Sequence, residues 1–165
     1  FRSELGISRA DTLEGLKACG GAHRRFEHKG TLGNVTVIDD YAHHPTEIKA
    51  TLAAAKETDH NDIWCVFQPH TYTRTKALLD DFAEALHTAD HVVLTDIYAA
   101  REKDTREVHS KDLLAKILEY GTDACYFSSF DEVENYLLIN CKKNDLLITM
   151  GAGDVVTIGE HLLGK

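Results

Sequence analysis

The sequence predicts an α/β fold: a Rossmann-like, doubly wound sheet of about six strands, mostly parallel with one antiparallel edge strand. Short apolar runs alternate with segments of helical periodicity along most of the chain, which is typical of a parallel sheet covered by helices. The first two runs are joined by a short connection, which allows only antiparallel pairing. With 165 residues, the chain is long enough for one domain with a substantial core.

The first part of the chain predicts a leading helix and linker, over residues 1–23, and then the antiparallel pair. Ser8 is a suitable N-cap, and the glycines at positions 20 and 21 suit the left-handed backbone that ends many helices. The paired strands are expected at residues 24–29 and 35–39, with a turn at 30–34 between them. β-branched residues dominate the second strand, which favours its burial in the sheet.

Four later runs predict the parallel part of the sheet. Each run is mostly apolar, as expected for strands that are buried on both faces. They lie at residues 63–67, 92–94, 124–127 and 146–149. Helices are expected between them, since apolar residues recur at spacings of three and four over residues 77–86 and 113–118.

Local signals mark where three other helices begin. Pro45 suits the first position of a helix that extends to Lys56, because its missing N–H would have no partner there, and His44 before it can act as the cap. Ser129 begins a capping box (S-F-D-E) that opens another helix. A last helix is expected after Asp154.

Composition and charge limit the classes of function. The net charge of −9, from 27 acidic and 18 basic residues, disfavours general binding to nucleic acids or membrane surfaces. No apolar run approaches the length that spans a membrane. The four cysteines form no C-x-x-C pair, and Cys65 and Cys125 fall in expected strands. Free buried thiols and a reducing, cytoplasmic location are therefore expected.

Polar, aromatic and titratable residues gather where the expected parallel strands end. Ligands of open α/β sheets bind at the carboxyl ends of the strands, so these segments are the place to look for a site. They are residues 39–47 (DDYAHHPTE), 67–75 (FQPHTYTRT), 95–102 (TDIYAARE) and 149–154 (TMGAGD). Because the four segments are expected at one edge of one sheet, we predict a single ligand site there.

The side chains of this edge leave several interpretations open. His43, His44 and His70, with Asp39 or Asp40, are suitable metal ligands, but no H-x-x-x-H or H-x-H spacing supports zinc. Contact with a ligand is the preferred role, and no metal site is expected. Because side chains alternate along a strand, only one of the two aspartates is expected to face the ligand edge. In the same way, one of the two arginines at positions 24 and 25 is expected to be solvated.

The glycine-rich turn at residues 151–153 has two interpretations. It can offer backbone N–H groups to an anion, or it can be a tight turn that Asp154 caps. The sequence contains no G-x-x-x-x-G-K-[ST] motif. The chain alone therefore has no phosphate-binding loop for ATP hydrolysis.

Four motifs, in order along nearly the whole chain, resemble the C-terminal domain of the Mur ligases. They are RRFE at 24–27, DDYAHHPTE at 39–47, FQPHTYTRT at 67–75 and GAGD at 151–154. Within the family, the double histidine with proline and the Gln-Pro-His motif are most similar to the branch that joins L-alanine to UDP-N-acetylmuramate. The alternatives are the branch that attaches a recycled tripeptide to the same sugar nucleotide, and a non-enzymatic module that binds a nucleotide or anion.

The resemblance implies that residues 1–165 are one domain of a three-domain, ATP-dependent, amide-forming ligase of peptidoglycan synthesis. Its partners would be the N-terminal and central domains of the same chain, and it would be inactive without them. ATP would be bound jointly, whereas Mg²⁺ would be held mainly by the central domain.

The resemblance also implies roles for single residues, none of them a self-sufficient catalytic group or a metal ligand. ATP-binding roles fall on Arg25, Asp40, Tyr41 and His43, and substrate-binding roles fall on His70 and Arg74. Some members of the family carry arginine where this chain has Thr71, which leaves more of any charge role at this turn to Arg74.

Overall fold

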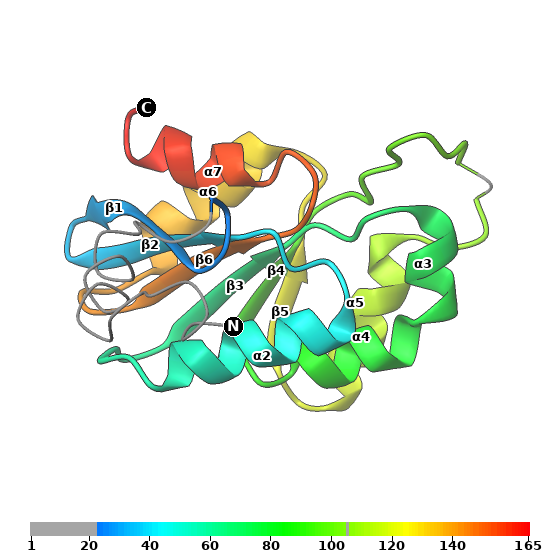
Figure 1. Ribbon diagram of the computed structural model, residues 1–165, viewed down its shortest axis with the longest axis horizontal. Coiled ribbons are helices and arrows are strands. Elements are labelled where there is room, and N and C mark those ends of the chain that lie inside the picture. Colours follow the sequence, from blue (N-terminus) through cyan, green and yellow to red (C-terminus); the bar gives the residue numbers. More distant parts are fainter. Residues whose placement is uncertain (1–22, 105) are drawn as a thin grey trace, which may run out of the picture.

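A six-stranded sheet forms the centre of the protein, in a computed structural model that describes residues 23–104 and 106–165 (Figure 1). The order across the sheet is β1-β2-β6-β3-β4-β5. The strands are β1 (Glu27–Leu32), β2 (Val35–Asp40), β3 (Ile63–Phe67), β4 (His91–Leu94), β5 (Asp123–Tyr126) and β6 (Leu146–Met150). β1 and β2 are antiparallel, and every other neighbouring pair is parallel. The predicted fold class is confirmed.

Helices cover both faces of this sheet (Figure 1). They are α2 (Pro45–Lys56), α3 (Tyr72–Ala77), α4 (Leu79–Leu86), α5 (Ser110–Glu119), α6 (Phe130–Asn140) and α7 (Val156–Leu162). Apolar residues of α2, α4 and α5 pack against one face, and those of α6 and α7 against the other. The sheet thus separates two hydrophobic cores, one on each face. Side chains alternate along a strand, so Cys65 of β3 packs in one core and Val66 in the other.

The first hairpin differs from the prediction at its boundaries. β1 begins at Glu27 because the backbone of Arg24 and Phe26 is left-handed, with φ angles of 54° and 46°, which no strand accommodates. Only Gly33 and Asn34 separate the two strands, both with positive φ. Two such residues make the type I′ turn, whose twist matches that of a hairpin. The expected strand at 24–29 and turn at 30–34 are therefore both displaced.

Several helix boundaries also differ. The helix expected at 77–86 is divided at Leu78, and α3 precedes the division. Pro45 does begin α2, and the Nδ1 atom of His44 caps it by accepting from the Thr46 N–H. Ser129 precedes α6 as expected, but its side chain makes no capping hydrogen bond. The helix expected after Ser8 lies outside the described residues.

The thiols agree with the sequence analysis only in part, because Cys65 is buried whereas Cys125 is half-buried. Cys65 is buried in β3, and Cys65, Cys125 and Cys141 are free cysteines. Burial raises the pKa of the Cys65 thiol to about 12 and that of Cys125 to about 11. Within residues 23–104 and 106–165, every helix is too short or too polar to cross a membrane.

Candidate functional site

Hydrogen bonds between backbone groups join the four predicted polar segments at the carboxyl edge of the sheet. Gly151 N donates to Asp40 O at 3.0 Å, which joins the ends of β6 and β2. Gln68 N donates to Met150 O, and Thr71 N donates to Tyr98 O, so the segments after β3, β4 and β6 are joined as well. The structure therefore brings together the residues that the sequence analysis predicted to share one edge.

Arg24 has a structural role at this edge, where its side chain joins the end of β2 to the glycine turn after β6. Its Nε donates to Asp39 Oδ2 at 2.7 Å, and its two terminal nitrogens donate to the carbonyl oxygens of Gly151 and Gly153. The Arg24 side chain is 12% exposed and that of Asp39 is fully buried. The other Asp39 oxygen accepts from the Thr149 hydroxyl. The glycine turn thus presents carbonyl groups to an arginine of the same chain.

Gln68 holds the other side of the glycine turn. Its Nε2 donates to Asp154 Oδ1 at 2.8 Å, and its Oε1 accepts from Val155 N at 3.2 Å. The Asp154 carboxylate is therefore bound to Gln68, and the residue that precedes α7 is Val155. The last helix follows Asp154 as expected, and the Asp154 carboxylate is held by Gln68 beside the glycine turn.

A cleft of about 170 Å³ lies between the chain before β1, the end of β2 and the first turns of α2. Its lining includes Arg25, Asp40, Tyr41 and Glu47. Arg25 is exposed, and Tyr41 is 42% exposed. The exposed guanidinium suits a phosphate or carboxylate, and the exposed phenol ring suits stacking on a planar group. Three of the four predicted ATP-binding residues therefore share one cleft.

The side chain of Asp40 supports this cleft by accepting hydrogen bonds from backbone N–H groups on both sides of it. One carboxylate oxygen accepts from Phe26 N and the other accepts from Ala42 N, both at 2.8 Å. Its side chain thus holds the chain before β1 against the turn after β2. Of the two neighbouring aspartates, Asp39 is fully buried and Asp40 reaches the cleft, as the alternation of side chains requires.

Four aromatic rings form a row next to the cleft. The ring centroids of Tyr41 and His43 are 5.4 Å apart, those of His43 and His70 are 5.7 Å apart, and those of His70 and Tyr98 are 5.7 Å apart. Arg74 reaches the same row, with its Nη1 3.2 Å from His70 Nδ1. The predicted substrate-binding residues His70 and Arg74 are therefore adjacent to His43.

The turn that presents His70 has a strained backbone. Thr71 has φ 67° and ψ 143°, a region that β-branched residues rarely adopt and that costs on the order of 1–3 kcal/mol. The conformation is held by the Thr71 N–H, which donates to Tyr98 O, and by the Thr75 hydroxyl, which donates to Thr71 O. Strained backbone of this kind clusters at active sites and ligand-binding segments.

Two residues of the site had no assigned role in the sequence analysis. The ring of Tyr98 stacks on His70, with an angle of 22° between the planes. The carboxylate of Glu102 accepts from both the backbone N–H and the hydroxyl of Thr73, at the start of α3. Their segment was expected at the edge, but nothing in its spacing distinguished these two residues from their neighbours.

His70 lies between His43 and Tyr98 in the row and next to Arg74. Burial, together with the positive charges of Arg74 and His43, lowers the pKa of His70 from its ordinary value. The lowered pKa favours the neutral form of the His70 imidazole. Within residues 23–104 and 106–165, no group of three or more His, Cys, Asp or Glu side chains is arranged to hold a metal ion.

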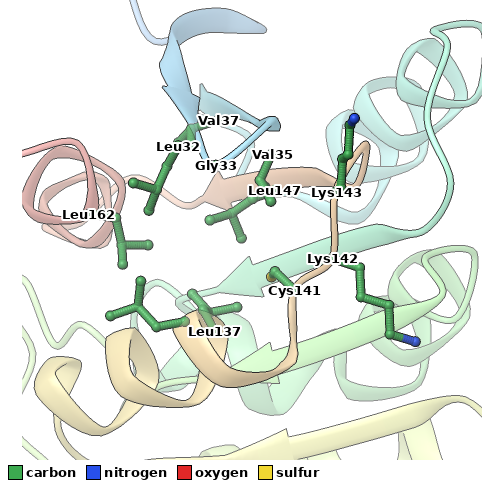
Figure 2. A pocket seen from close by; sticks show the side chains of 11 residues that line it. Leu32, Gly33, Val35, Val37, Leu137, Cys141, Lys142, Lys143, Leu147 and Leu162 are labelled. Carbon is green, nitrogen blue, oxygen red and sulfur yellow. The ribbon is translucent and has the colours of Figure 1, made fainter.

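A second cleft, of about 200 Å³, lies at the opposite edge, next to the β1–β2 turn and the ends of α6 and α7 (Figure 2). Its lining is mostly apolar, with leucines 32, 137, 147 and 162 turned toward one another. The charged ends of Lys142 and Lys143 point away from these leucines (Figure 2). The leucines therefore give this cleft an apolar surface.

Comparisons with known proteins agree with this geometry. The family model "Mur ligase, glutamate ligase domain" matches residues 24–153. The chain is 57% identical to the UDP-N-acetylmuramate–L-alanine ligase of Lachnoclostridium phytofermentans, over all of this chain and 37% of that protein. It thus spans about a third of the length of the curated relatives that it matches.

Solved structures of similar ligases agree with the family match. The crystal structure of UDP-N-acetylmuramate–alanine ligase from Thermotoga maritima is similar with a TM-score of 0.80 and 32% identity, over 99% of this chain and 34% of that one. The murein peptide ligase of Psychrobacter arcticus is similar with a TM-score of 0.71 and 27% identity, over 98% of this chain and 34% of that one.

Proposed function

Because this chain belongs to the Mur ligase family, we propose that it is the C-terminal, ATP- and amino-acid-binding domain of a ligase that joins L-alanine to UDP-N-acetylmuramate. The observation that carries the proposal is that His43, His70 and Arg74 meet beside the Arg25–Tyr41 cleft, in a chain 57% identical to a ligase of that name. The reaction would belong to cytoplasmic peptidoglycan synthesis, with the N-terminal and central domains as partners.

In the proposed reaction, ATP phosphorylates the carboxylate of the sugar nucleotide, and the amine of L-alanine then displaces the phosphate. This domain supplies orientation and charge stabilisation to that reaction. Arg25, Asp40, Tyr41 and His43 would contact the nucleotide. His70 and Arg74 would contact the amino acid, which His43 would also meet. Mg²⁺, which would neutralise phosphate charge, would be held mainly by the central domain.

The tripeptide-recycling activity is the second candidate, since a murein peptide ligase has a similar structure. The 27% identity to that protein, against 57% to a ligase for L-alanine, favours the alanine activity. An assay of the complete enzyme with L-alanine and with the tripeptide separates the two. Faster turnover with the tripeptide would contradict our proposal.

The 165-residue chain alone is expected to show no ligation. It has no glycine–lysine phosphate loop, and its edge supplies only part of a site for ATP. The measurement is phosphate release with ATP, Mg²⁺, UDP-N-acetylmuramate and L-alanine, for the chain alone and for the complete enzyme. Turnover by the chain alone would show that its own residues suffice.

Arg25→Ala in the complete enzyme is expected to raise the KM for ATP by about tenfold or more, because a charge-assisted hydrogen bond contributes about 1.5–3 kcal/mol. The free energy of unfolding should hardly change, since Arg25 is exposed. Lys56→Ala, which removes an exposed charge at the end of α2, is the matched control. An unchanged KM for ATP in the Arg25 variant would remove this residue from the nucleotide site.

A further inference from the structure

The two histidines of the aromatic row have opposite partners at their Nδ1 atoms. His43 Nδ1 is 3.0 Å from Tyr41 O and 3.6 Å from Glu47 Oε2, and both of these oxygens can only accept a hydrogen bond. His70 Nδ1 is 3.2 Å from Arg74 Nη1, which can only donate. The proton of neutral His43 is therefore on Nδ1, and that of neutral His70 is on Nε2.

The Nε2 atoms consequently have opposite characters. In neutral His43, Nε2 carries a lone pair and accepts, whereas Nε2 of His70 carries a proton and donates. Among residues 23–104 and 106–165, neither Nε2 has a hydrogen-bond partner. The ring centroids are 5.7 Å apart. One small zwitterion can therefore place its ammonium group at one ring and an anionic oxygen at the other.

The surrounding charges reinforce this difference. Glu47 accepts from the backbone N–H of His43 at 3.1 Å as well as lying near its ring. Burial acts to raise the pKa of Glu47, but that hydrogen bond and the positive charges of His43 and Arg25 outweigh it, so the pKa is lowered. An ionised carboxylate thus adjoins His43, whereas a guanidinium adjoins His70. Glu102 is the nearby carboxylate that opposes Arg74 at His70.

Resting on the proposed function, we propose that His43 takes the proton from the ammonium group of the incoming amino acid, while His70 acts only as a hydrogen-bond donor. Glu47 is then a positioning residue, which orients the His43 ring and stabilises the imidazolium after the transfer. The arrangement follows a general pattern, in which a carboxylate holds the ring nitrogen opposite the one that accepts the proton.

The step balances as follows. One N–H bond of the ammonium group breaks, and its proton passes to His43 Nε2. The freed lone pair forms the C–N bond at the carbonyl carbon of the acyl phosphate, and the C–O bond to phosphate breaks with its electron pair on the phosphate. A second proton leaves the nitrogen and is taken up by that phosphate. His43 returns its own proton to solvent.

Kinetics of the complete enzyme test this assignment with the same substitution at two sites. His43→Gln keeps a hydrogen-bonding group but no base, so kcat/KM for L-alanine should fall by about 100- to 10,000-fold near neutral pH. The loss should shrink as rising pH frees the amine. His70→Gln retains an N–H donor, so its loss should be smaller and independent of pH. In the pH profile of kcat/KM for L-alanine, Glu47→Gln should move the acidic limb to lower pH, because the imidazolium of His43 loses a neighbouring carboxylate. Loss of a merely structural residue would not move this limb.

Equal, pH-independent losses at His43 and His70 would overturn the inference, as would an unmoved acidic limb in Glu47→Gln. If the wild-type enzyme did not ligate L-alanine, the proposed function itself would be wrong.

Long-range ¹H–¹⁵N NMR spectra of the histidine-labelled chain test the tautomers without an activity assay. The His43→Gln and His70→Gln variants assign the signals. We expect the Nδ1–H tautomer for His43 and the Nε2–H tautomer for His70. The reverse tautomers would overturn the inference.

Discussion

Arg24→Ala is expected to lower the free energy of unfolding by about 3–5 kcal/mol, the usual cost of removing one partner from a buried ion pair. Asp39 is fully buried, and among the side chains of the described residues its carboxylate would retain only the Thr149 hydroxyl as a partner. The carbonyl groups of Gly151 and Gly153 would lose their donors in the same substitution. Both effects act at the edge that carries the candidate site.

Urea unfolding of the wild type and the Arg24 variant measures this loss, and Arg25→Ala is the control. Arg25 is the next residue but is exposed, so its removal should change the free energy of unfolding by less than about 0.5 kcal/mol. Adding Asp39→Asn to Arg24→Ala should recover part of the loss, because no unpaired charge is then buried. Similar stabilities for the two arginine variants would contradict the structural role of Arg24.

Gly153→Ala is expected to damage both the fold and the site. A Cβ atom at this position would lie 2.2 Å from Gln68 Oε1 and 2.7 Å from Cγ of Tyr98. Gln68 cannot move freely, because its amide is bonded to Asp154 and Val155. Overpacking of this kind costs about 1–3 kcal/mol. Since the Tyr98 ring stacks on His70, its displacement should also lower the kcat of the complete enzyme.

Thermal unfolding and the histidine spectra of the variant chain measure these two effects separately. The Gly153→Ala substitution should cost less in a Tyr98→Ala background, because one of its two clashes is then absent. Unchanged stability, together with an unchanged His70 signal, would mean that the glycine turn accepts a side chain and does not support the site.

Without the family resemblance, the residues alone did not show how the paired aspartates and arginines of the predicted edge divide their roles. Alternation along a strand predicted that only one of the two aspartates would face the ligand edge, and one of the two arginines was expected to be solvated. Which one depends on the backbone at Arg24 and Phe26, whose positive φ angles carry no clear signal in these residue types. The structure turns Arg24 and Asp39 inward as an ion pair, and leaves Arg25 and Asp40 at the cleft.

The sequence by itself determined the fold class, the antiparallel edge and the concentration of polar residues at the strand ends, because periodicity and turn residues are local properties. The tertiary structure decided that β6 lies between β2 and β3, which places the glycine turn against Gln68 and Arg24. It also placed opposite hydrogen-bond partners at the Nδ1 atoms of His43 and His70, a carbonyl oxygen at one and a guanidinium at the other. A hydrogen-bond partner sets the proton of an imidazole, and such partners become neighbours only when the chain folds.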